Sequence, residues 1–89
     1  MNENEIKILM GVDNRYKYLA RDKDNKMFLF ETKPKKRVVE GLWDSPMTNR
    51  DSIKDFSMFS HLFADVRWED VEPLKIRENI NEKEQEREI

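Results

Sequence analysis

Apolar and polar residues alternate most clearly in two short runs that flank a polar pentapeptide. The runs cover residues 16–21 and 27–32, and the polar residues between them are Asp22-Lys-Asp-Asn-Lys26. Tyr, Phe and Leu suit a pleated, half-buried surface, whereas Asp and Asn tolerate the conformations that reverse a chain. The pattern therefore predicts a β-hairpin. Because an isolated hairpin is only marginally stable in water, other segments must pack on it.

Alternation along the two strands places apolar side chains on both faces of this hairpin. We therefore expect one face to contact a helix and later segments to cover the other. The alternating residues are Tyr16, Tyr18 and Ala20 against Leu19 in the first strand, and Phe28 and Phe30 against Met27 and Leu29 in the second.

Residues 2–11 carry the pattern of a short helix. Asn2 and Glu5 have the spacing of an N-cap residue and its reciprocal partner. Apolar residues at positions 6, 9 and 10 fall on one helical face, and Gly11 stands where helices commonly end. The sequence predicts a helix at 3–10 that docks on the sheet, because two helical turns are unstable alone.

The residues after the hairpin predict further short elements. A β-branched and aromatic run at 38–43 predicts a third strand beside the second, and residues 44–51 have loop chemistry. Residues 52–63 fit either one helix or a short strand followed by a helical turn at 60–63, and we prefer the second interpretation. Alternation at 66–69 predicts a last extended segment.

These elements predict a small α+β fold, with an antiparallel sheet of three or four strands, one N-terminal helix and a short helical turn. We place this single domain at residues 1–76 and treat residues 77–89 as a charged C-terminal tail. Most of the core is expected to come from Tyr18, Leu19, Phe28, Phe30, Trp43, Phe56, Phe59, Phe63, Val66 and Trp68.

Composition narrows the class of protein. The 89 residues are 37% hydrophobic and 40% charged, which indicates a lean core under a charged surface. The absence of cysteine excludes disulfides and thiolate zinc sites. No stretch has the pattern of a signal peptide or of a transmembrane helix, so we expect a cytoplasmic protein. A lean core and open sheet edges make a homodimer reasonable.

Charge is segregated along the chain, although the formal net charge is only −2. Residues 14–40 hold nine basic and four acidic side chains, whereas residues 64–89 hold five basic and nine acidic ones. Two interpretations follow. The segments complement each other within the molecule or between neighbours, or one of them attracts a partner of opposite charge.

The sequence offers little material for catalysis. His61 is the only histidine, and Ser57 and Ser60 lie close to it without the strand–turn–helix context of an activated nucleophile. Two glycines do not form a phosphate-binding loop. The acidic residues at 69, 70 and 72 are better explained as solvated side chains than as metal ligands. We predict a protein that is not an enzyme and has no cofactor or bound metal.

Three motifs carry a resemblance to a known group of proteins. They are Tyr18-Leu-Ala-Arg-Asp22, Lys33-Pro34 and Leu62-Phe-Ala-Asp-Val-Arg-Trp-Glu-Asp-Val-Glu-Pro73. In this order they resemble small, mostly uncharacterised proteins of phages and prophages of Gram-positive bacteria. The similarity covers roughly residues 16–76. It implies a genomic setting, and no activity belongs to the group as a whole.

Our main functional hypothesis is that the chain binds a host or defence-system protein and modulates or inhibits it. The expected surface combines an aromatic anchor, Trp68, with an acidic rim formed by Glu69, Asp70 and Glu72. Such a surface would dock on a basic partner. The competing interpretation is that Trp68 belongs to the core and the acids are merely solvated.

The alternative hypothesis is a small nucleic-acid-binding protein. Lys33, Lys35, Lys36 and Arg37 cluster beside a strand that carries two phenylalanines. A basic loop can hold phosphates while bases stack on aromatic rings. The slightly acidic net charge and the lean core, which needs those rings, argue against this role.

Overall fold

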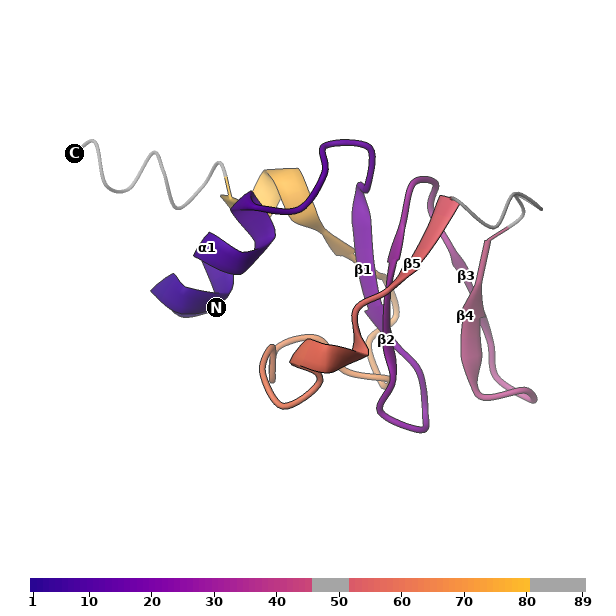
Figure 1. The fold of residues 1–89 in the computed structure, drawn as a ribbon. Helices are drawn as coiled ribbons and strands as arrows, with labels where there is room; N and C mark the ends of the chain where they lie inside the picture. The colour runs from indigo at the N-terminus through magenta and orange to yellow at the C-terminus, as the bar shows by residue number, and fades with distance from the viewer. Residues whose placement is uncertain (46–51, 81–89) are drawn as a thin grey trace.

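The predicted hairpin is the centre of the structure. It consists of β1 (Tyr18–Arg21) and β2 (Met27–Phe30), which pair antiparallel with Leu19 opposite Leu29. Asn25 has the positive φ of 77° that the connecting turn requires. The computed structural model describes residues 1–45 and 52–80 (Figure 1).

Two further strands complete an antiparallel sheet in the order β5-β2-β1-β6. Strand β5 (Ile53–Asp55) pairs with β2, and the two-residue strand β6 (Leu74–Lys75) pairs with β1. This sheet and the helices described below confirm the predicted α+β class.

Helix α1 (Glu3–Met10) confirms the predicted N-terminal helix. The Asn2 side chain accepts the Glu5 backbone N–H at 2.9 Å, and the Glu5 carboxylate accepts the Asn2 backbone N–H at 3.0 Å. This reciprocal cap satisfies two donors that a helix start leaves unpaired. The buried Leu9 on its inner face joins the core.

The two faces of the sheet carry separate hydrophobic clusters, as the alternation in the hairpin predicts. Tyr16 is the exception, because it lies before β1 and packs in the larger cluster instead of beside Tyr18 and Ala20. The larger cluster includes residues of α1 and of the C-terminal end; the smaller one centres on Ala20, Phe30 and Trp43. The ten predicted core residues all belong to these clusters, although Tyr18, Phe28, Phe59 and Trp68 are only half-buried. The larger cluster comprises Leu9, Tyr16, Leu19, Met27, Leu29, Phe56, Phe63, Val66, Ile76 and Ile80.

The prediction of a third strand at 38–43 is wrong. That stretch contains a turn, which joins β3 (Lys35–Arg37) to β4 (Leu42–Asp44) in a separate two-stranded sheet. Gly41 makes the turn possible because its φ of 72° is one that side-chain-bearing residues rarely adopt. The place beside β2 is taken by β5.

For residues 52–63, the preferred interpretation of a strand followed by a helical turn is confirmed. The helical turn, however, lies a few residues before the predicted range of 60–63. The strand is β5, and the 3₁₀ turn η2 covers Ser57–Phe59. The extended segment predicted at 66–69 is wrong. There the Asp70 side chain accepts the Arg67 backbone N–H, and the Asp70 N–H donates to the Arg67 carbonyl, which closes a turn.

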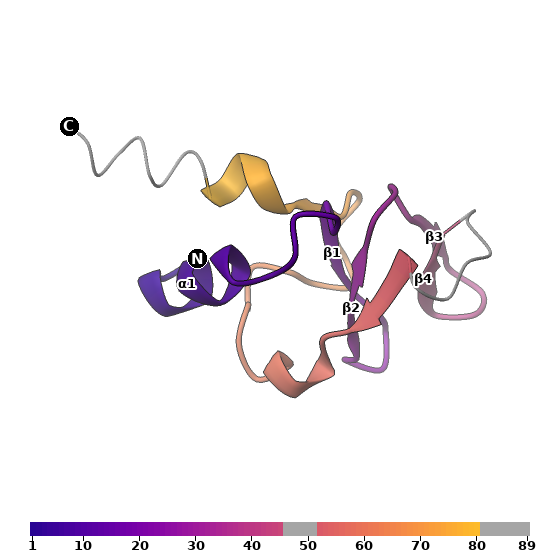
Figure 2. The same cartoon turned by 45° about the horizontal axis from the view of Figure 1, so that its top comes forward.

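The described chain ends in a helical stretch at residues 76–80 that lies beside α1 (Figure 2). Ile76 and Ile80 are buried in the larger cluster, and the Arg77 guanidinium donates to the Val12 carbonyl at 2.9 Å. The rest of the predicted tail lies outside the described residues, as does most of the predicted loop at 44–51. Helix α1 and the β3–β4 sheet lie at opposite ends of the molecule in both views.

Candidate interaction site

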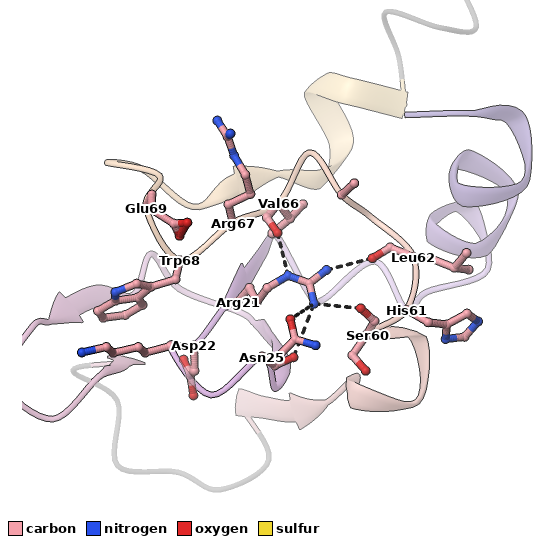
Figure 3. Close-up of a pocket in the computed structure, with 12 residues that line it drawn as sticks. Arg21, Asp22, Asn25, Ser60, His61, Leu62, Val66, Arg67, Trp68 and Glu69 are labelled. Atoms are coloured by element: carbon pink, nitrogen blue, oxygen red, sulfur yellow. Dashed lines mark hydrogen bonds between the residues drawn. The ribbon is translucent and has the colours of Figure 1, made fainter.

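A buried arginine organises the irregular segment from Ser60 to Val66. Arg21 ends strand β1 on the same face as Leu19, so its side chain points into the larger cluster. Its guanidinium donates to the carbonyls of Ser60, Leu62 and Val66 at 2.7–2.9 Å and to the Asn25 side chain at 2.8 Å (Figure 3). It also donates to the Phe63 carbonyl at 3.1 Å. The arginine therefore supplies the hydrogen-bond donors that a neighbouring strand would supply to the carbonyls of a strand in a sheet.

No carboxylate accepts a hydrogen bond from Arg21; all of its acceptors are carbonyl or amide oxygens of described residues. Burial lowers the pKa of Arg21, because a dry environment disfavours the charged form. An arginine nevertheless stays protonated in a protein. The site thus contains a fixed positive charge that backbone and amide oxygens stabilise.

A second charged side chain holds the same loop from the opposite direction. Glu5 of α1 accepts the Phe63 backbone N–H at 2.6 Å with the oxygen that the helix cap does not use. Phe63 is fully buried and has a φ of 59°, a left-handed conformation that is unfavourable for a bulky residue. Glu5 and Arg21 together hold the loop in this conformation.

A pocket of about 420 Å³ opens beside this loop. Two residues of the predicted acidic surface, Trp68 and Glu69, lie in its wall (Figure 3). Asp22, also in the wall, accepts the Trp43 backbone N–H at 2.9 Å, and its burial raises the pKa of its carboxyl group. The pocket also contains the cationic side chains of Lys23 and Arg67, so its wall carries both signs of charge.

The structure brings the predicted acidic and basic segments together. Lys33 forms an ion pair with Glu72 at 2.7 Å, which lowers the pKa of the Glu72 carboxyl group and raises the pKa of the Lys33 amine. The Lys36 ammonium lies 5.1 Å from the centre of the Trp43 ring and 4.6 Å from that of Trp68. It also donates to the Trp68 backbone carbonyl.

The remaining charged side chains of these two segments differ in whether they have a partner within the molecule. Arg37 forms an ion pair with Asp44 at 3.2 Å, and Asp70 lies within the turn that begins at Arg67. Lys35 and Glu69 are exposed, and neither makes an ion pair within residues 1–45 and 52–80. They are the charges of the two segments that remain available to a partner.

Val71, which the sequence analysis did not single out, is among the most exposed apolar side chains. It is 87% exposed and stands between Asp70 and Glu72. Two other valines, Val38 and Val39, are 70% and 96% exposed at the turn of the β3–β4 hairpin. These three exposed valines are candidates for contact with a partner.

The side chains of Ser57, Ser60 and His61, the residues considered for catalysis, make no hydrogen bond to one another in the described part of the chain. The Ser57 hydroxyl bonds to the backbone of Met27, and the Ser60 carbonyl accepts from Arg21, while His61 is exposed. No group of three or more potential metal ligands occurs among residues 1–45 and 52–80. In the same part of the chain, no helix has the length and apolar character needed to cross a membrane.

Comparisons of the chain with known protein families, with curated proteins and with solved structures find no match.

Proposed function

We propose that the chain is a non-catalytic accessory protein that binds a host or defence-system protein and modulates or inhibits it. The resemblance to small phage and prophage proteins supplies the biological setting. The exposure of Val71, directly after the Arg67–Asp70 turn, supports the binding role. An apolar side chain that projects from a charged surface fits an interface in which a dry centre is surrounded by polar groups.

The charge and apolar character of this surface indicate which kind of partner surface would fit it. Glu69, Asp70 and Glu72 surround Val71 in sequence, but Asp70 also contacts Arg67 and Glu72 also pairs with Lys33. The partner therefore presents an apolar depression beside a basic group that meets Glu69. Trp68 fixes the position of this surface on the fold, because its half-buried ring packs against the smaller hydrophobic cluster. In this proposal the anchor is therefore Val71, whereas Trp68 holds the turn in place.

The basic segment is less suited to nucleic acid, the alternative partner. Nucleic-acid binding gains affinity from several cations that are free to contact phosphates. Lys33 and Arg37 already form ion pairs, and Lys36 lies between two tryptophan rings. We therefore rank protein binding above nucleic-acid binding.

The proposal is tested by affinity capture from a Gram-positive host lysate, with and without nuclease, using matched variants. Glu69→Lys and Val71→Lys change the proposed surface at exposed positions. Glu40→Lys and Val39→Lys make the same substitutions at exposed positions in the β3–β4 turn. Asp70 and Glu72 are left unchanged, since their substitution would also remove a turn contact or an ion pair.

We expect one host protein to be retained despite nuclease by the wild type and by the two control variants. Glu69→Lys and Val71→Lys should each lose it, with the charge effect largest at low ionic strength. Retention of the protein by Val71→Lys would contradict the proposal. Capture that disappears with nuclease would instead support the nucleic-acid alternative.

A further inference from the structure

A second, mainly apolar pocket of about 390 Å³ lies between α1, β5 and η2, and we call it the α1–η2 groove. Its floor is formed by buried residues and its walls by half-buried ones, so it exposes part of the larger hydrophobic cluster to solvent. The apolar side chains that line it are Ile8, Val12, Tyr16, Leu29, Phe56 and Phe59. Apolar pockets of this size accept large side chains of a partner.

Met58 projects from η2 at the edge of this groove and is 77% exposed. The neighbouring aromatic residues of the same turn, Phe56 and Phe59, pack against each other with ring centres 4.8 Å apart. Met58 is therefore an apolar projection beside an apolar depression. A flexible, unbranched thioether side chain adapts to irregular cavities.

The charges at the rim of the α1–η2 groove are of both signs. Lys7 and Lys54 supply positive charge, and neither makes an ion pair within the described part of the chain. Asp13 and Asp55 supply negative charge while accepting backbone N–H groups two residues further on. The rim is thus neutral as a whole but strongly polar.

We propose that a second copy of this chain occupies the groove, and that Met58 of each copy inserts into the groove of the other about a two-fold axis. In a two-fold interface the same patch faces itself, so a patch must carry both a projection and a cavity, and both signs of charge. The α1–η2 groove meets both conditions. Lysines of one copy face aspartates of the other.

The other apolar side chains that are more than two-thirds exposed in the described part of the chain do not meet these conditions. Val71 stands between two carboxylates, and the Val38–Val39 turn follows the basic run of residues 35–37. A patch dominated by one sign of charge repels a copy of itself and selects a partner of opposite charge. The edge of β5 is also a poor self-pairing site, because antiparallel pairing centred on Lys54 would place two lysines opposite each other.

The first test measures self-association of the whole chain by sedimentation equilibrium. We expect a monomer–dimer equilibrium for the wild type and for Val39→Glu, which adds the same charge to an exposed apolar position elsewhere. Met58→Glu should weaken dimerisation by about tenfold or more, since it removes the central apolar contact of both copies. Because Met58 is exposed, circular dichroism should show both variants folded.

The second test locates the contact, and it uses the absence of cysteine from the sequence. Copies carrying only Met58→Cys are mixed with copies carrying only Val12→Cys under mild oxidation. We expect a disulfide-linked dimer of one copy of each kind. The matched pair of Val39→Cys with Val12→Cys should give little of it, because Val39 lies in the distant β3–β4 turn.

Two results would overturn the proposal. One is a wild-type chain that stays monomeric up to about 1 mM, the range in which even weak specific contacts become populated. The other is a dimer that Met58→Glu leaves intact or that cross-links equally well through Val39. Either outcome leaves the groove to a different occupant or places the interface elsewhere.

Discussion

At the scale of single residues, the structure depends on charged side chains that bond to backbone groups. Arg21 uses one planar group of five N–H donors to satisfy carbonyls of a loop that has no ladder of its own. Glu5 uses its two oxygens for two different tasks, the helix cap and the Phe63 N–H. Both side chains bond to backbone groups of residues 60–66, which lie in neither a helix nor a strand.

Replacement of Arg21 by Met should destabilise the protein by about 3–5 kcal/mol, because several buried carbonyls lose their donor at once. Arg21→Lys should recover only part of this loss, since an ammonium has three donors and cannot reach the same spread of oxygens. Urea unfolding measures both. Arg67→Met, at an exposed arginine with one long ion pair, is the control and should cost less than about 1 kcal/mol.

Replacement of Glu5 by Gln should cost about 1–3 kcal/mol. The amide has one acceptor oxygen in place of two, so either the Asn2 N–H or the Phe63 N–H is left unpaired. Thermal unfolding of Glu5→Gln beside Glu40→Gln, the same change at an exposed turn position, measures the difference. Equal melting temperatures would show that the loss of one of these two hydrogen bonds has no measurable effect on stability.

At the scale of elements, the helices and strands that short-range sequence signals specify could be predicted, whereas those that depend on long-range contacts could not. Helix α1 and the β1–β2 hairpin could be predicted because their signals lie within a few residues, such as the pairing of Asn2 with Glu5. The β3–β4 hairpin was missed because the basic run at 35–37 has the composition of a loop, and because Gly41 was not recognised as a turn residue. Strand β6 is only two residues long and has no detectable period.

The candidate site was harder to predict than the fold. In β1, Arg21 lies on the same face as the buried Leu19, and this position alone did not mark it as a site residue. Its acceptors lie 39 to 45 residues further along the chain, apart from Asn25 in the adjoining turn. No local pattern records such contacts. The acidic segment was predicted as a surface, but the exposure of Val71 could be found only from the structure.

The turn η2 should give the protein a measurable dependence on pH. Its start is held by Asp55, and the backbone N–H of Ser57 lowers the pKa of the Asp55 carboxyl group below its ordinary value of 3.8. A lowered folded-state pKa means that this contribution to stability is present above 3.8 and is lost as the pH falls through the folded value.

Urea unfolding from about pH 6 to about pH 2 tests this contribution. Asp55→Asn keeps an acceptor for the Ser57 N–H but has no charge to titrate. The variant should therefore lose less stability than the wild type as the pH falls. Other carboxylates titrate equally in both proteins, so the difference between them isolates Asp55. Identical pH profiles would contradict the assignment.

At the scale of the whole molecule, the small β3–β4 sheet packs on the main sheet through Trp43 and is attached by polar contacts to the segment that precedes β6. Lys36 lies between the rings of Trp43 and Trp68, which are the only tryptophans of the chain. The ion pair of Lys33 with Glu72 joins the same two parts at the surface. Much of the charge segregation in the sequence is thus used within one molecule.

Lys36→Ala should loosen this attachment and can be followed by intrinsic fluorescence, because both emitting rings flank the substituted side chain. We expect the emission to shift towards longer wavelength and the stability to fall by about 1–2 kcal/mol, for a desolvated cation–π contact and a hydrogen bond. Lys35→Ala, at the exposed neighbouring position, should change neither. An unchanged spectrum for Lys36→Ala would contradict the attachment.

The loop around Arg21 also has a consequence for the order in which the protein assembles. The β1–β2 hairpin leaves the ribosome about forty residues before the carbonyls that its arginine will bind. A hairpin forms within microseconds but is only marginally stable alone, so the guanidinium stays hydrated until residues 60–66 are synthesised and pack on it. Because one side chain binds four carbonyls of this segment, the amide hydrogens of residues 60–66 should exchange with solvent as one cooperative group.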